Sequence, residues 1–252
     1  FLARLHTIFG SSESSSCPLL PGVSGTVEIA PDTLRNWEED FDVLHSKILE
    51  SSSSEDFDAD NFFRGMPPTW HDLDANLDVP RDITPALAKD LEIRFQDGPS
   101  FTLELWHSPG AGGTTVAYRV AWELRAKRPI AVLRRYSRLT ADRVDSVYQK
   151  TQKPVLIVAD ASDLPSTARE ELLRELGRRN ARVGLLYLVR SPRKESEATL
   201  QIVDPMSSES EVSRFVEAYL PRCKNDYRRH RIKQIGDIKN ASLEIYRSPF
   251  FF

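Results

Sequence analysis

The stretch HSPGAGGTT, residues 107–115, holds the residue types in this chain that best fit a chemical role. Successive backbone N–H groups of such a loop can converge on a phosphate group, helped by the positive end of a following helix dipole. Glycine allows that close approach and the positive φ angles that some loop positions need. The candidate phosphate-binding residues are therefore Pro109, Gly110, Ala111, Gly112, Gly113, Thr114 and Thr115.

This loop departs in two places from the GxxxxGK[ST] pattern of phosphate-binding loops. His107 stands where the first glycine belongs and Gly113 stands where the lysine belongs, whereas Gly112 and Thr114 match. The hydroxyl of Thr114 would bind Mg²⁺. Because the lysine is the point charge on the β- and γ-phosphates, its absence predicts weaker nucleotide binding and slow or no hydrolysis. A tight glycine-rich turn without a ligand is the alternative.

A second candidate is the acidic residue that ends the apolar run PVLIVAD. Asp160 follows Thr114 by 46 residues, and a carboxylate there can hold Mg²⁺ beside the loop threonine. The alternative is that Asp160 caps the turn at the end of a strand. Ala161 stands where many proteins of this class have an acid, which leaves Asp163 as a poorly placed substitute. Asp160 and Asp163 are thus the candidate catalytic residues, and Thr114 and Asp160 the candidate metal ligands.

Arginines at two strand ends can replace the charge of the missing lysine. Arg134 and Arg135 follow PIAVL, and Arg190 ends LLYLVR. In an open α/β sheet both places face the carboxyl edge, where ligands bind. The alternative for each arginine is a solvated surface charge.

The elements that must position these residues alternate between strand and helix. The predicted strands are residues 101–106, 129–134, 154–160, 182–189 and 199–203. The predicted helices are residues 83–95, 114–127, 140–149, 166–178 and 209–219. This alternation with short connections predicts an α/β fold, a three-layer parallel-sheet P-loop NTPase domain with a partial helical or loop-like N-terminal segment.

We divide the chain into four parts on its composition. Residues 1–60 are expected to be a partly disordered linker or the remnant of an upstream domain, with one amphipathic helix at 33–49. Residues 61–100 are a helical lead-in, in which Trp70 packs against the α/β domain. Residues 101–220 form the P-loop NTPase core, and residues 221–252 a basic helical extension that starts a following domain. The chain is therefore expected to be a fragment of a longer protein.

Composition itself excludes few partners. The net charge of −3 argues for none in particular, and no run reaches the roughly 18 apolar residues of a membrane span. We therefore expect no membrane partner. Cys17 and Cys223 lie outside any CxxC or His/Cys metal spacing, which favours a reducing, cytoplasmic compartment. No metal spacing joins His45 and His71.

Several of these segments together resemble one family. FFRGMPPTW, LWHSPGAGGTTVAYRVAWELR, KPVLIVADASDL, LLYLVR and RSPFFF are similar to the NTPase region of antiviral proteins like sterile alpha motif domain-containing protein 9 and of their bacterial relatives. That family belongs to the STAND group, the signal-transducing NTPases with numerous domains. The resemblance covers residues 61–252 and is most specific in PGAGGTT.

The resemblance implies a nucleotide-binding regulatory switch in antiviral or innate-immune defence. Its cofactors would be ATP or GTP with Mg²⁺, and its partners other domains of the same chain and a homo-oligomer. Carried over by position, Gly110 to Thr115 would be the phosphate loop, Asp160 the metal-binding acid and Arg190 a sensor of the γ-phosphate. His107 and Ala161 depart from the pattern, which affects hydrolysis more than binding.

Two other functions are left open by the sequence. The basic run at 222–233 surrounds Tyr227 and can track a nucleic-acid backbone, although such runs are more often solvated helix faces. The α/β domain can also be a nucleotide-free scaffold for oligomerisation. Bound nucleotide after gentle purification would distinguish the switch from the scaffold.

Overall fold

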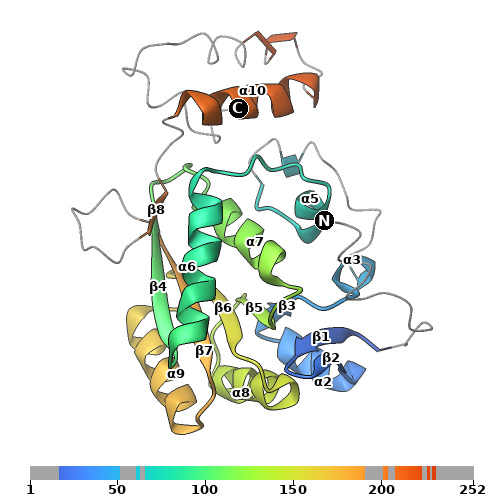
Figure 1. The fold of residues 1–252 in the computed structure, drawn as a ribbon, viewed down its shortest axis with the longest axis vertical. Helices are drawn as coiled ribbons and strands as arrows, with labels where there is room; N and C mark the ends of the chain where they lie inside the picture. The colour runs from blue at the N-terminus through green and yellow to red at the C-terminus, as the bar shows by residue number, and fades with distance from the viewer. Residues whose placement is uncertain are drawn as a thin grey trace.

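The computed structural model describes residues 17–51, 61–62, 66–190, 201–203, 208–222, 226–227 and 229–230. At its centre is a six-stranded sheet with the strand order β3-β5-β6-β7-β4-β8 (Figure 1). The strands are β3 (Phe41–Val43), β4 (Phe101–His107), β5 (Ile130–Leu133), β6 (Val155–Asp160), β7 (Val183–Arg190) and β8 (Gln201–Val203). All neighbours pair in parallel except β3, which is antiparallel to β5.

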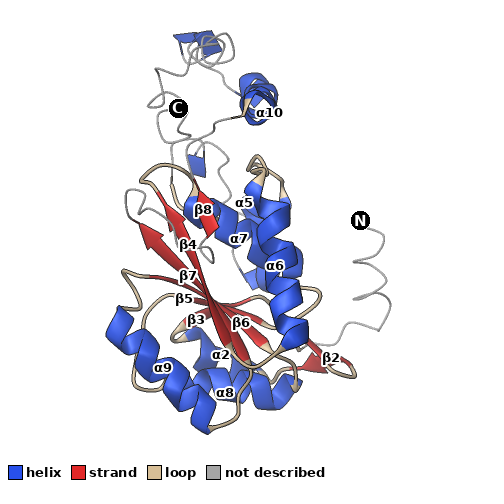
Figure 2. Cartoon of the chain, turned by 60° about the vertical axis from the view of Figure 1, so that its left-hand side comes forward, coloured by secondary structure: helices blue, strands red, loops and turns tan. Residues whose placement is uncertain are grey.

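Helices cover both faces of this sheet (Figure 2). On one face are α5 (Trp70–Asp74), α6 (Ile83–Asp97) and α7 (Gly113–Leu124), and on the other are α2 (Pro31–Glu38), α8 (Thr140–Thr151) and α9 (Ser166–Arg178). Further described elements are β1 (Leu19–Gly22), β2 (Gly25–Glu28), α3 (Ile48–Ser51), α10 (Glu209–Tyr219) and the 3-10 helix η2 (Leu220–Arg222). The expected three-layer α/β fold is thus confirmed.

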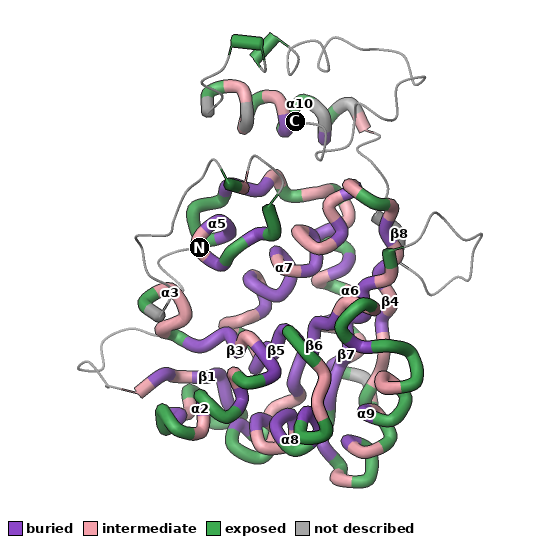
Figure 3. The backbone as a smooth tube through the Cα atoms, turned by 180° about the vertical axis from the view of Figure 1, so that it is seen from behind, coloured by how far each residue is buried: buried purple, intermediate pink, exposed green. Residues whose placement is uncertain are grey.

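Two hydrophobic cores follow from the alternation of side chains along the strands. In β6, Leu156 and Val158 join the core under α6 and α7, whereas Val155, Ile157 and Ala159 join the core under α8 and α9. A strand that is buried on both faces needs an apolar residue at every position, which explains the uninterrupted apolar run VLIVA. Figure 3 shows β5 and β6 largely in the colour of buried residues.

The alternation predicted from residue 83 onward is confirmed. Helices α9 and α10 have the bounds that the apolar spacing predicts, and the other elements differ by a few residues at their ends. The predicted packing of Trp70 is confirmed as well. Its ring stacks on Tyr118 at 5.0 Å and on Trp122 at 6.0 Å, and both of these residues belong to α7.

The amphipathic helix predicted at 33–49 is wrong in its second half. Helix α2 ends at Glu38, and Phe41–Val43 form β3, in which Phe41 pairs with Leu133 and Val43 with Ala131. A short apolar run fits both the helical and the strand period. Pairing with β5 makes this segment a strand. The N-terminal residues 17–51 thus contribute a hairpin, a helix and a sheet strand to the α/β layers, instead of the loop-like linker that their composition predicts.

The described part of the chain contains neither a membrane-spanning helix nor a cluster of metal-binding side chains. No helix in it is long and apolar enough to cross a membrane. Within the same residues, no group of three or more His, Cys, Asp and Glu side chains is arranged to hold a metal ion. The basic run at 222–233, for which nucleic-acid binding is an alternative, falls largely outside the described residues.

Candidate phosphate-binding site

The glycine-rich loop connects the end of β4 to the start of α7. Gly110 has a φ of 75° and Gly112 a φ of 83°, both in the left-handed region that residues with a Cβ rarely adopt. The N–H of Ala111 donates to the carbonyl of Ser108 at 3.1 Å, which closes the turn. Gly112 is the N-cap of α7 and, among the described residues, no side chain caps this helix. The first-turn N–H groups therefore face outward as donors for an anion.

The two departures from the standard loop pattern are structurally a single feature. A Cβ atom built on Gly113 would lie 2.3 Å from Cγ of His107. No side chain at position 113, lysine included, fits while the imidazole occupies that place. The histidine at the first position of the motif thus accounts for the glycine at the lysine position.

His107 carries a polar atom that lacks a partner. The residue is 4% exposed, its Nδ1 lies 3.2 Å from the Ser108 carbonyl, and its Nε2 bonds to nothing among the described residues. Burial lowers the pKa of His107, and the Ser108 carbonyl and Asp160 offset this only in part, while Arg190 lowers it further. The ring is therefore neutral, with its proton on Nδ1, because a carbonyl only accepts. Nε2 is then a buried acceptor beside the loop, a position that calls for a ligand hydroxyl or an ordered water.

Two candidate site residues, Asp160 and Arg190, end strands at the same edge of the sheet as His107. His107 ends β4, Arg190 ends β7 and Asp160 ends β6, and His107 pairs in register with Arg190. Two positions before each of them lies a residue that is buried in the core under α7, namely Leu105, Leu188 and Val158. Since side chains alternate along a strand, all three point to the face that carries α7 and the loop. The fold therefore brings Asp160 and Arg190 to the carboxyl edge on the side of the loop, as expected, and it places His107 with them.

Asp160 also caps its turn, as the alternative interpretation predicted. Its Oδ1 accepts from the N–H and from the hydroxyl of Ser162, both at 2.8 Å. Both bonds go to the same oxygen, so Oδ2 can still face a cation. Capping orients the carboxylate and is compatible with metal binding.

Asp163 lies beside Asp160 in the same turn. Its N–H donates to the Asp160 carbonyl at 3.0 Å. Desolvation, and next the charge of Asp160, raise the pKa of Asp163. Burial raises the pKa of Tyr118 in α7 to about 12, with further contributions from Asp42, Asp163 and Asp160. The two carboxylates are therefore within electrostatic range of the helix that follows the loop.

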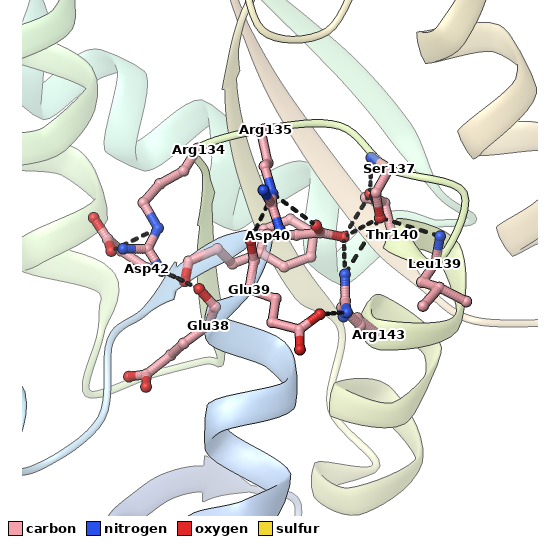
Figure 4. Close-up of polar contacts among 11 residues, drawn as sticks. Glu38, Glu39, Asp40, Asp42, Arg134, Arg135, Ser137, Leu139, Thr140 and Arg143 are labelled. Carbon is pink, nitrogen blue, oxygen red and sulfur yellow. Dashed lines mark hydrogen bonds and ion pairs between the residues drawn. The ribbon is translucent and has the colours of Figure 1, made fainter.

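Arg134 and Arg135 do not lie at the loop, contrary to expectation. They follow β5, which is separated from β4 by β6 and β7, and they bond to β3 and to the connection that precedes it (Figure 4). Nε of Arg134 lies 3.3 Å from Oδ1 of Asp42, and Nε of Arg135 donates to the Glu39 carbonyl at 3.1 Å. The strand order, which the sequence does not reveal, takes both cations away from the site.

A cation that the sequence reasoning missed does reach the loop. Nη1 of Arg81 donates to the Ala111 carbonyl at 2.6 Å, and a Cβ on Gly112 would lie 3.8 Å from the same nitrogen. Arg81 precedes the loop by some 30 residues and sits just before α6 in VPRDIT, a stretch without a recognisable motif. Only the packing of this segment against the loop reveals it.

The fold and the loop together define the class of protein. A parallel sheet, a glycine loop between β4 and α7, and an acid at the end of a strand two places away are the parts of a P-loop NTPase domain. A sequence model of the novel STAND NTPase 5 family matches residues 60–200, more than half of the chain. The chain belongs to that family.

The chain was also compared with curated proteins and with solved structures. A search of curated proteins gave no match. Among solved structures, one described as the structure of C. elegans PCH-2 is similar, with a TM-score of 0.41 and 14% identity. The match covers 61% of this chain and 50% of that chain, so this chain spans about half the length of that structure.

Proposed function

We propose that the domain binds ATP or GTP with Mg²⁺ and acts as a slowly hydrolysing or non-hydrolysing regulatory switch. The observation that carries this proposal is the loop between β4 and α7, whose glycines at positive φ leave the first-turn amides of α7 without a cap from any described side chain, beside the strand ends of Asp160 and Arg190. The first-turn amides of Gly113, Thr114 and Thr115 would hold the phosphates, as in other helix-terminus anion sites, while the N–H of Ala111 is already bonded to the Ser108 carbonyl. Arg190 would contact the γ-phosphate.

Mg²⁺ would be held by the hydroxyl of Thr114 and the free carboxylate oxygen of Asp160. Bound there, the ion neutralises charge on the β- and γ-phosphates. The same residues argue for slow turnover. Ala161 offers no base, and Asp163 is exposed in the turn after the strand. Without lysine, the site favours binding over hydrolysis.

The proposed biological setting follows from the STAND family and from the resemblance to antiviral proteins with sterile alpha motifs. Nucleotide occupancy would bias a closed or an oligomeric state of a longer cytoplasmic protein in antiviral or innate-immune defence. Other domains of the same chain and further copies of it would be the partners. Trigger and effector would lie in those other domains.

Variants of the two metal ligands test nucleotide binding. Thr114→Ala and Asp160→Ala are expected to abolish the increase in melting temperature that ATP and Mg²⁺ give the wild type, because each removes a ligand of the ion. Ser162→Ala is the matched control, since it removes one bond to Oδ1 of Asp160 and keeps the carboxylate. An equal thermal shift in all four proteins would refute the assignment. Phosphate release should stay far below that of ordinary NTPases.

A further inference from the structure

Helix α10 is docked on the segment that precedes α6. Its N-cap residue Ser208 accepts from the N–H of Glu211 at 3.1 Å, and its hydroxyl donates to Oδ2 of Asp82 at 2.9 Å. The N–H of Asp82 in turn donates to Oε1 of Glu211 at 2.8 Å. Arg214 adds an ion pair with Asp82. The first turn of α10 and residues 80–82 therefore form a continuous polar contact between segments some 130 residues apart.

The centre of this contact is a buried ion pair. Nε of Arg81 lies 2.7 Å from Oε1 of Glu211, and the two side chains are only 11% and 5% exposed. The same guanidinium donates through Nη1 to the Ala111 carbonyl in the phosphate loop. A single side chain thus links the loop to α10. Figure 1 shows α10 beyond the end of the sheet at which β4 finishes.

This arrangement sets two anions in competition. A guanidinium has five donors in a planar fork that suits phosphate as well as carboxylate. A triphosphate at the first-turn amides would bring several negative charges close to Arg81 and to the buried carboxylate of Glu211. Like charges at short range in a buried site repel strongly. Either Arg81 stays paired with Glu211, or Arg81 pairs with the phosphates and the Glu211 carboxylate moves out of the contact.

We propose that Arg81 supplies the cationic phosphate contact that the loop lacks at Gly113, and that Glu211 withholds Arg81 from the phosphates in the nucleotide-free protein. Nucleotide binding and the docking of α10 are then mutually exclusive uses of one guanidinium. This inference rests on the proposed nucleotide binding. It adds a structural consequence of that binding, the release of the first turn of α10.

Affinity measurements on four variants of the full chain test the competition. Calorimetric titration with Mg·ATP is expected to give a Kd for Glu211→Gln about 10-fold below that of the wild type, because the neutral amide holds Arg81 less tightly. Arg81→Gln is expected to bind about 10-fold more weakly than the wild type. In the double variant the gain from Glu211→Gln should disappear, which separates release of Arg81 from a general loss of negative charge. Glu217→Gln, which removes an exposed carboxylate farther along α10 and leaves the Arg81–Glu211 pair intact, is the matched control and should bind like the wild type.

A second measurement needs no variant. Amide hydrogen exchange of Glu209–Tyr219 in the wild type should become faster when Mg·ATP is added, because the first turn of α10 loses its buried contact. Unchanged or slower exchange, or equal Kd values for the wild type and Glu211→Gln, would overturn the inference while nucleotide binding stands. If neither the wild type nor Glu211→Gln binds any nucleotide, the proposed function and this inference fail together. Binding by Glu211→Gln alone would support both.

Discussion

At the residue scale, the imidazole of His107 and the absent side chain of Gly113 are complementary. The 2.3 Å separation between Cγ of His107 and a Cβ at position 113 is far below any real contact. Restoring the standard lysine alone should therefore harm the protein, even though lysine is the usual residue at this position.

The substitution Gly113→Lys tests this complementarity. We expect it to cost about 1–3 kcal/mol of stability, as overpacking does, and to give no gain in nucleotide affinity. The double variant His107→Gly with Gly113→Lys should regain stability and bind Mg·ATP more tightly than His107→Gly alone. Urea unfolding and calorimetry measure the two effects. A fully stable Gly113→Lys protein would contradict the packing described.

Another buried histidine predicts a pH dependence of stability. Burial, with a contribution from Lys47, lowers the pKa of His45 to about 4 from 6.5. The unfolded chain therefore takes up a proton at this residue near pH 6.5, and the folded protein does so only near pH 4. Stability falls as the pH drops through that window, by at most roughly 3 kcal/mol. In His45→Gln the free energy of unfolding should fall less between pH 7 and pH 4 than in the wild type. Urea unfolding measures this, and equal pH profiles for the two proteins would count against a role of His45.

Residue types indicated the loop, Asp160 and Arg190 from the sequence alone, because a motif and a strand end are local signals. Arg81 and Glu211 carry no such signal. One precedes the loop by some 30 residues and the other follows it by some 100. Their approach depends on how α10 packs, which no spacing in the sequence encodes.

At the element scale, β3 depends on a buried charged cluster at its start. Asp40 is fully buried and accepts from the hydroxyls of Ser137 and Thr140 at 2.8 Å each, and Nη1 of Arg143 lies 2.7 Å from the same oxygen (Figure 4). Burial would raise the pKa of Asp40, but Arg143, Thr140 and Ser137 outweigh it and lower the pKa. This cluster ties the connection between α2 and β3 to the start of α8.

Replacing the acid should therefore be costly. Asp40→Ala removes the buried counter-charge of Arg143 and leaves it only the half-exposed carboxylate of Glu39, and we expect a loss of about 3–5 kcal/mol in the free energy of unfolding. Asp32→Ala is the control, because the side chain of Asp32 is 89% exposed and its pair with Arg35 lies at the surface. Chemical denaturation compares the two. Similar losses would show that the cluster does not stabilise the edge of the sheet.

The same cluster explains why the helix predicted at 33–49 is wrong. The apolar residues of that stretch fit a helical period, but Asp40 is placed in the middle of it and becomes the junction between α2 and β3. Propensity and period are local, whereas the partner of β3 is β5, some 90 residues later. Antiparallel edge strands are for this reason beyond what periodicity predicts here.

At the scale of the whole molecule, the alternation of strands and helices determines the class of fold but leaves the strand order open. That order places β7 between β6 and β4 and takes β5 away from the loop. The strand order explains why Arg190 lies beside His107. Arg134 and Arg135 instead lie beside β3, the edge strand farthest from β4 on that side of the sheet. The site is thus a product of topology as much as of motif.

In the proposed function, main-chain amides at the start of α7 hold phosphates without a lysine. Calorimetric titration of the wild type with Mg·ATP and, separately, with inorganic tripolyphosphate and Mg²⁺ tests it most directly. We predict that both ligands bind at a single site and displace each other, and that Thr114→Ala loses the binding of both. Absence of binding by either ligand at millimolar concentration, or binding of ATP that tripolyphosphate does not displace, would contradict it.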